Sequence, residues 1–174
     1  MLSDDDANTY ATHYTTFGHS WWQLSIVPSA AKQFLGTDIY GDSLANYLGI
    51  AGYYGNGSAQ CSLSCPGHVH LGPQPIQGSN PIAYYNGTAS YWWGISFDDL
   101  AGALSYVDNL YNVPGTYYAT SNNCVTQAVN VGWEAYVPLN YYGFMPCGLG
   151  NYLNTLSGSV AQFAGKKHRK LGMS

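Results

Sequence analysis

Residues 122–135 of this chain read Asn-Asn-Cys-Val-Thr-Gln-Ala-Val-Asn-Val-Gly-Trp-Glu-Ala, and the spacing of their apolar positions predicts a helix that begins near Asn122 or Asn123. Four of these positions are expected to face inward: Val125, Ala128, Val129 and Gly132. Cys124 would lie one or two residues inside the helix, where unpaired backbone N–H groups stabilise negative charge and lower the pKa of a thiol. We therefore predict that Cys124 is a nucleophile, with N–H groups beside it forming part of an oxyanion site.

A predicted strand far upstream supplies an imidazole for such a nucleophile. Residues 17–27 read Phe-Gly-His-Ser-Trp-Trp-Gln-Leu-Ser-Ile-Val, and this density of aromatic and β-branched residues is typical of a strand. Alternation directs His19, Trp21, Gln23 and Ser25 to one face of it. Because an imidazole can accept or hold the proton of a neighbouring thiol, His19 is the expected base.

The rest of the chain predicts an α+β fold, with strands first and helices after them. Further strands are expected at 49–54, 69–71, 82–85 and 90–95, with a short extended piece at 117–119 and a short helix at 148–156. The clearest helix covers 97–111, because Ser96 is a favourable N-cap and Asp98 and Asp99 complement the helix dipole. Its expected apolar face is Phe97, Leu100, Ala101, Leu104, Val107 and Tyr111. We expect an antiparallel sheet packed on the Cys-bearing helix and on this second helix.

Two segments taken together resemble a known superfamily. Gly18-His19-Ser20-Trp21-Trp22-Gln23-Leu24, followed downstream by Asn122-Asn123-Cys124-Val125-Thr126-Gln127-Ala128, is similar to the circularly permuted NlpC-type papain-like proteins, which include the lecithin-retinol-acyltransferase-like group. In that superfamily the histidine strand precedes the cysteine helix. The resemblance covers roughly residues 17–140 and implies a papain-like permuted fold, with Cys124 as nucleophile and His19 as base.

The resemblance also implies a third polar residue that orients the base. His70 is the candidate retained, because a strand at 69–71 could pair with the His19 strand; His68 and Asn86 are alternatives. Asn123 is a candidate for the oxyanion site. No cofactor is expected.

The four cysteines leave structural alternatives open. Cys124 could be a buried small side chain or could form a disulfide with Cys147, Cys61 or Cys65. Cys61, Cys65, His68 and His70 have ligand types that suit zinc, but their spacing within ten residues is tighter than two separated ligand pairs. A Cys61–Cys65 disulfide or ordinary loop chemistry is preferred there, and no metal site is predicted.

The length of 174 residues suits one domain. Residues 1–12 are expected to be a polar lead-in, 13–160 a single papain-like domain with a loop insertion at 55–81, and 161–174 a basic tail. Four of the five basic residues lie in 166–170, so nine acidic residues face a single lysine in the rest of the chain. Such an acidic body disfavours nucleic-acid binding.

Charged residues make up only 8 % of the chain, whereas it has 17 tyrosines and 21 glycines, a composition common in exported proteins. No apolar run of about 18 residues is present, so no transmembrane segment is expected. The N-terminus shows no signal-peptide pattern. The expected compartment is extracellular or the cell envelope.

Two functions of different classes remain. The first is a thiol-dependent hydrolase or acyltransferase that acts through Cys124 and His19 on an amide or ester carbonyl of a peptide, a peptidoglycan stem or a lipid ester. The second is a non-catalytic surface or assembly protein on the same scaffold, whose tyrosines and glycines serve self-association or contact with glycans.

Overall fold

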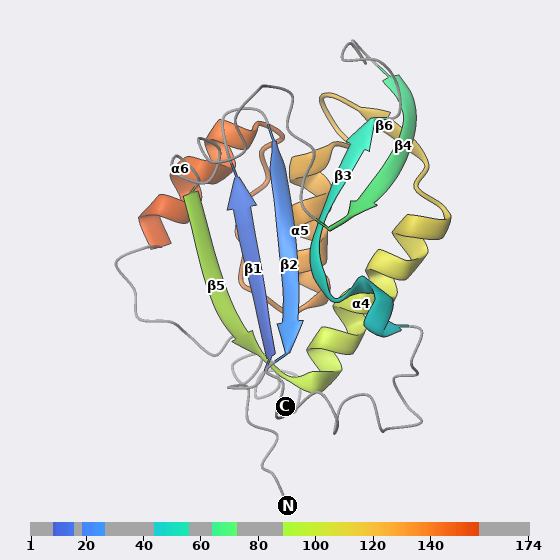
Figure 1. Cartoon of the computed structure of the whole chain (residues 1–174). Coiled ribbons are helices and arrows are strands. Elements are labelled where there is room, and N and C mark those ends of the chain that lie inside the picture. The colour runs from blue at the N-terminus through green and yellow to red at the C-terminus, as the bar shows by residue number, and fades with distance from the viewer. Residues whose placement is uncertain (1–8, 16–18, 27–43, 56–63, 73–88, 157–174) are drawn as a thin grey trace, which may run out of the picture.

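The structure, a computed structural model, describes residues 9–15, 19–26, 44–55, 64–72 and 89–156. It is an α+β fold with a six-stranded sheet in the order β5-β1-β2-β3-β4-β6, in which every neighbouring pair is antiparallel (Figure 1). The strands are β1 (Thr9–Thr15), β2 (Ser20–Ile26), β3 (Gly49–Gly55), β4 (Ser64–Leu71), β5 (Ala89–Ile95) and β6 (Thr116–Tyr118). The α+β prediction and its antiparallel sheet are confirmed.

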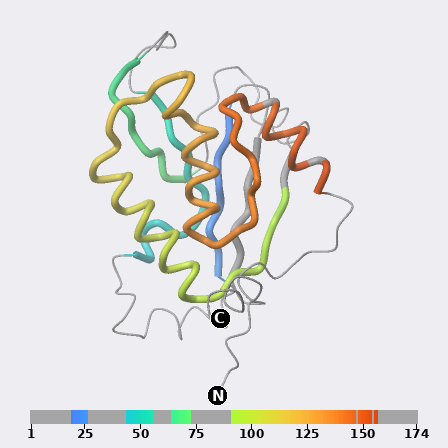
Figure 2. Tube along the Cα trace, turned by 180° about the vertical axis from the view of Figure 1, so that it is seen from behind, coloured from blue at the N-terminus to red at the C-terminus, as the bar shows by residue number. Residues whose placement is uncertain are grey.

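In the part of the chain that the structure describes, three helices pack on one face of the sheet, as Figure 2 shows from behind. They are α4 (Phe97–Asn112), α5 (Cys124–Glu134) and α6 (Pro146–Leu156), and a short 3-10 turn, η2 (Ala45–Tyr47), precedes β3. No helix in the described ranges has both the length and the apolar character that a membrane crossing requires.

The core lies between the sheet and the helices because alternate strand residues point toward α4 and α5. Trp22 of β2 pairs with Ala51 of β3, and Tyr53 of β3 pairs with Val69 of β4, so these four side chains share the buried face. Cys124 belongs to the same core. The sheet therefore fixes the position of the α5 N-terminus relative to the ends of β2 and β3.

Helix α4 begins where local sequence predicts it. The Ser96 hydroxyl accepts the backbone N–H of Asp99 at 3.2 Å, and the Asp99 carboxylate accepts both the hydroxyl and the backbone N–H of Ser96. This is a complete capping box. The buried face differs at one end from the expected one, since Leu110 is buried and Tyr111 is 47 % exposed.

Two predicted segment boundaries differ from the structure. Residues 9–12, expected in a polar lead-in, belong to β1, whose backbone pairs with both β2 and β5. The expected loop at 55–81 contains the eight-residue strand β4, of which only 69–71 was predicted. The strand predicted at 82–85 and the basic tail at 161–174 lie outside the described residues.

Candidate active site

The helix that carries Cys124 starts at a capping box built from Asn123 and Thr126. The Oδ1 atom of Asn123 accepts the backbone N–H groups of Val125 at 3.0 Å and Thr126 at 3.1 Å. In return, Oγ1 of Thr126 accepts the backbone N–H of Asn123 at 2.8 Å. The box satisfies N–H groups that have no partner within the helix, and it makes Cys124 the first residue of α5.

Asn123 caps this helix and does not have the free donor that an oxyanion needs. Its Nδ2 atom donates to the carbonyl oxygens of Ala119 at 2.7 Å and Phe144 at 2.9 Å. Its backbone N–H is bound by Thr126, so each of its donor nitrogens is engaged. Asn123 ties the two flanking loops to the start of α5, and the oxyanion role predicted for it stays a prediction.

We expect Asn123→Ala to lower the free energy of unfolding by about 1–2 kcal/mol, the usual cost of losing an N-cap. Asn123→Asp is the matched variant, because it keeps the accepting oxygen for Val125 and Thr126 but cannot donate to Ala119 and Phe144. It should lose less stability than the alanine variant. Urea unfolding followed by tryptophan fluorescence measures both, and equal losses would contradict the capping role.

The thiol of Cys124 is free and buried, with 4 % of the residue exposed. The alternative prediction that Cys124 forms a disulfide is therefore wrong. Burial raises the pKa of the thiol, while hydrogen bonds from the backbone N–H of Ser20, the hydroxyl of Tyr117 and the backbone N–H groups of Val125 and Cys124 lower it. Because burial is the largest of these effects, the resting group is a protonated thiol surrounded by donors.

Tyr117 lies over this thiol from the edge strand β6. Burial raises the pKa of its hydroxyl, and so does the neighbouring Cys124. Its ring stacks on the ring of Tyr53, with centroids 5.6 Å apart. The Tyr53 hydroxyl in turn donates to the carbonyl oxygen of Pro114 at 2.7 Å. Tyr117 is therefore held by contacts with β3 and by the loop that leads into β6.

A chain of side-chain hydrogen bonds links α4 and α5 to β6, the strand that carries Tyr117. The Tyr106 hydroxyl donates to Oε1 of Gln127 at 2.6 Å, and Nε2 of Gln127 donates to Oδ1 of Asn122 at 2.5 Å. Nδ2 of Asn122 donates to the carbonyl oxygen of Thr116 at 2.7 Å and to the Tyr53 hydroxyl at 3.3 Å. Asn122 thus fixes β6 relative to the start of the Cys-bearing helix.

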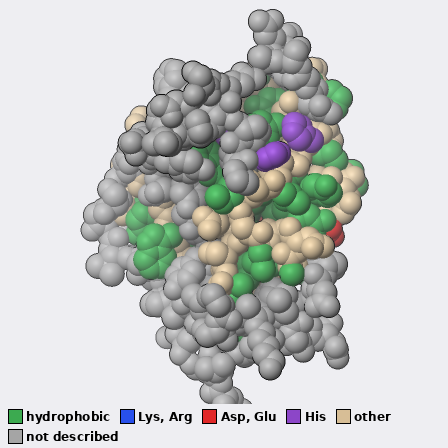
Figure 3. Space-filling view, viewed as in Figure 1, with side chains coloured by type: hydrophobic (Ala, Val, Ile, Leu, Met, Phe, Trp, Pro, Cys, Tyr) green, Lys and Arg blue, Asp and Glu red, His purple; other side chains and the backbone are tan. Residues whose placement is uncertain are grey.

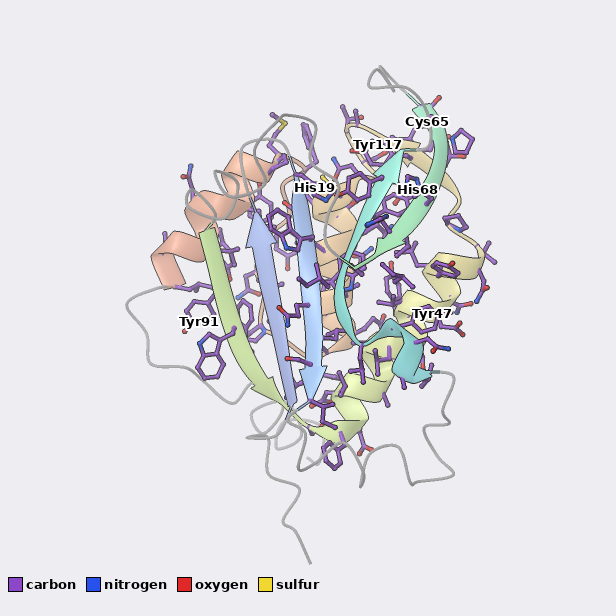
Figure 4. The ribbon with its side chains drawn as sticks, in the orientation of Figure 1. His19, Tyr47, Cys65, His68, Tyr91 and Tyr117 are labelled. Atoms are coloured by element: carbon purple, nitrogen blue, oxygen red, sulfur yellow. The ribbon has the colours of Figure 1, made fainter. Side chains whose placement is uncertain are left out.

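His19 immediately precedes β2 and lies at the same end of the sheet as Tyr117 (Figure 4). It is 7 % exposed, and its Nε2 atom is buried. Its ring stacks on Tyr54 at 4.2 Å between centroids and on Trp21 at 5.8 Å. Because the next residue, Ser20, donates its backbone N–H to the thiol, the structure brings the main chain at His19 close to Cys124.

Two further histidines, His68 and His70, contact Tyr54, the residue on which the His19 ring stacks. His68 of β4 pairs with Tyr54, and its ring stacks on Tyr54 at 5.6 Å, while His70 meets Tyr54 edge-on at 6.3 Å. Figure 3 shows histidine side chains side by side on this face. Burial and the nearby charge of His70 lower the pKa of His68. The strand β4 pairs with β3 and not with β2, so the pairing with the His19 strand on which the choice of His70 rested is wrong. The role of His70 as third member stays a prediction, and Asn86 lies outside the described residues.

Cys65 of β4 is in a disulfide, so it offers no thiolate to a metal. Cys61, the other predicted thiol of that segment, lies outside the described residues. Among the residues that the structure describes, no group of three or more His, Cys, Asp or Glu side chains could hold a metal ion.

Tyr117 and Tyr54 are the two residues of the site that sequence reasoning missed. Tyr117 bonds the thiol, and Tyr54 stacks on the predicted base. In a chain with 17 tyrosines neither has a local signal of its own. The prediction of 117–119 as extended places Tyr117 on a strand but does not indicate its neighbour.

No protein-family model, curated protein or solved structure matches this chain.

Proposed function

We propose that this protein is a thiol-dependent hydrolase or acyltransferase that uses Cys124 to attack an amide or ester carbonyl. The observation that carries the proposal is a free thiol on the first residue of α5, with donors from Ser20, Tyr117 and Val125 directed at its sulfur. Such donors stabilise a thiolate and, at a helix N-terminus, a developing oxyanion. We also propose that the fold is the papain-like permuted fold and that the protein is related to the superfamily that its sequence resembles.

The raised pKa of the Cys124 thiol favours attack in which a base removes the thiol proton over attack by a thiolate that is already formed in the free enzyme. In the proposed first step, His19 takes the thiol proton as the sulfur bonds to the carbonyl carbon. The carbonyl oxygen becomes an oxyanion near the backbone N–H of Cys124. When the leaving alcohol or amine departs, it takes the proton from His19 and leaves a thioester on Cys124.

The second step separates the two activities of the proposal. In a hydrolase, water attacks the thioester with His19 again as base, and the product is a free acid. In an acyltransferase, an acceptor alcohol or amine attacks and carries the acyl group away. We propose a peptide, a cell-wall peptide or a lipid as substrate.

The setting that we propose for this chemistry is extracellular or in the cell envelope. The support is the disulfide at Cys65, because disulfides form and persist in oxidising compartments. The described ranges contain four acidic residues and neither Lys nor Arg. That charge pattern supports a partner other than nucleic acid.

An acylation experiment tests the proposal. The oxidised protein is incubated with an activated thioester of a short acyl chain, and peptides are mapped by mass spectrometry. The expected result is one acyl adduct on Cys124 that disappears on addition of hydroxylamine, which cleaves thioesters. Absence of acylation at Cys124 with several acyl chains and peptide esters would count against the proposal.

An alternative on the same scaffold, a surface or assembly protein, has one observation in its favour. Large side chains are exposed along and after α5, and Trp133 and Tyr142 are in ring contact at 5.9 Å. Exposed aromatic groups of this kind favour contact with a partner or a second copy. Self-association without any acylation of Cys124 would favour this alternative.

A further inference from the structure

Asn122 holds the main chain on both sides of Tyr117. Its Nδ2 atom donates to the carbonyl oxygen of Thr116 at 2.7 Å, and its own carbonyl oxygen accepts the backbone N–H of Tyr118 at 2.8 Å. Asn122 also lies two residues before Cys124, whose sulfur accepts a hydrogen bond from the Tyr117 hydroxyl. One residue therefore joins the strand that carries the donor to the start of the helix that carries the thiol.

We propose that Asn122 is a positioning residue for the nucleophile: it aligns Tyr117 so that the tyrosine hydroxyl donates to the sulfur of Cys124. Gln127, in turn, fixes the direction of the Asn122 amide. The part that this alignment plays in catalysis rests on the proposed function. The alignment itself is a property of the fold and can be measured without a substrate.

The direction of the Asn122 amide is fixed at both of its ends. Its Nδ2 atom faces the carbonyl oxygen of Thr116 at 2.7 Å and the Tyr53 hydroxyl at 3.3 Å, and a carbonyl oxygen can only accept. Its Oδ1 atom faces Nε2 of Gln127 at 2.5 Å. A turned amide would place oxygen against oxygen at Thr116 and nitrogen against nitrogen at Gln127. The amide therefore has one favourable direction.

Gln127 is held in the same way by the helix behind it. The residue is 7 % exposed, and its Oε1 atom accepts the Tyr106 hydroxyl of α4 at 2.6 Å. The Tyr106 oxygen accepts Nδ2 of Asn130 at 3.1 Å, so the hydroxyl hydrogen is directed at Gln127. Because Tyr106 binds the oxygen of the Gln127 amide, the NH2 group of that amide is directed at Asn122. A buried network whose members have their partners is rigid, so it transmits the position of α4 and α5 to β6.

The strand β6 needs such an anchor because it is a short edge strand. It has three residues, and among the described strands it pairs with β4 alone. Short segments with few backbone hydrogen bonds shift at a low cost in free energy. The stacking of Tyr117 on Tyr53, with centroids 5.6 Å apart, holds the ring near the thiol but does not fix where the hydroxyl points. The aim of the hydroxyl therefore depends on the main-chain position that Asn122 sets.

Loss of the Asn122 side chain should make the thiol harder to ionise. The pairing with β4 and the contact with Tyr53 remain, so the Tyr117 ring still covers the sulfur. The misaligned hydroxyl no longer stabilises the thiolate, so the pKa of Cys124 rises further. Alkylation by iodoacetamide follows the thiolate fraction and should slow down. General loosening of the fold would have the opposite effect, because it admits water and reagent to a buried thiol.

The test is a double-mutant cycle on the rate at which iodoacetamide alkylates Cys124 at neutral pH, read from the mass of the peptide that contains Cys124. Asn122→Ala and Tyr117→Phe should each lower the rate roughly tenfold, which corresponds to about one pKa unit and to one hydrogen bond to a charged group. In the Tyr117→Phe protein, Asn122→Ala should have no further effect, because the hydroxyl that it aligns is absent. Asn112→Ala is the matched control and should leave the rate unchanged, since this amide donates to Asp108 of its own helix at 2.9 Å.

Gln127→Met tests the second half of the proposal and replaces Asn122→Ala if that variant does not fold. Methionine has nearly the length of glutamine but lacks the NH2 group that fixes the Asn122 amide. The rate should fall roughly two- to tenfold, the equivalent of one neutral hydrogen bond, and it should not fall in the Tyr117→Phe protein. Urea unfolding shows which variants are folded.

Two outcomes would overturn the positioning role. One is alkylation of folded Asn122→Ala or Gln127→Met at or above the wild-type rate. The other is the same slowing in the Tyr117→Phe protein as in wild type, because Asn122 would then act on the thiol by another route. These rates require no acyl substrate. Absence of acylation at Cys124 would therefore refute the proposed function and leave the positioning role standing.

Discussion

Replacing Cys124 by alanine is expected to reduce acyl turnover to the background rate while the fold stays intact. The alanine lacks the sulfur that forms the thioester, so no acyl-enzyme can form. The stability cost should be about 1 kcal/mol, since a single buried atom is removed and its donors lose a partner. Steady-state assays with the substrate found by the acylation experiment measure turnover, and urea unfolding measures stability.

Cys124→Ser is the control that separates the chemistry from the packing. The serine hydroxyl can accept the same hydrogen bonds from Ser20 and Tyr117, so the start of α5 should keep its geometry. A hydroxyl there is a much weaker nucleophile than a thiol, and turnover should still be lost. If both variants kept wild-type turnover, Cys124 would be a structural residue and the catalytic proposal would be wrong.

Helix starts could be predicted because they are decided by a few neighbouring residues. Ser96 with Asp99, and Asn123 with Thr126, form their capping boxes within one turn of helix. A single sequence therefore contains all that these boundaries require. The position of Cys124 at the start of α5, on which the site depends, follows from the same local rule.

Strand β4 could not be predicted in full because its composition is that of a loop. Pro66 and Gly67 usually interrupt strands. In the fold, Gly67 lies against the Tyr53 side chain, where a Cβ atom would overlap the tyrosine ring. The glycine is therefore there for close packing between β3 and β4. Such a requirement depends on a residue distant in sequence and leaves no local pattern.

The surroundings of the thiol depend on strand register in the same way. Tyr117 reaches Cys124 because β6 pairs with β4, and Tyr54 reaches His19 from the neighbouring strand β3. Sequence spacing indicates which residues share a face of one strand, but it does not tell which residues of other strands stand beside them. The position of the Cys124 thiol at the start of α5 was thus predictable, and the residues around the thiol were not.

Replacing His19 is expected to lower kcat/KM roughly 100- to 10,000-fold, the usual contribution of a general base. The informative variant is His19→Phe. Its ring can preserve the stacking on Tyr54 and Trp21, while it can neither accept nor donate a proton. Stability should therefore change little, and turnover should fall.

His68→Phe is the matched control for that variant, because His68 also stacks on Tyr54, with ring centroids 5.6 Å apart. If proton transfer by His19 carries the reaction, His68→Phe should retain most of the turnover that His19→Phe loses. If His19 serves only to pack against Tyr54, the two variants should behave alike and keep their activity. Equal activity in both, with Cys124→Ala inactive, would keep the nucleophile and assign the base to another residue.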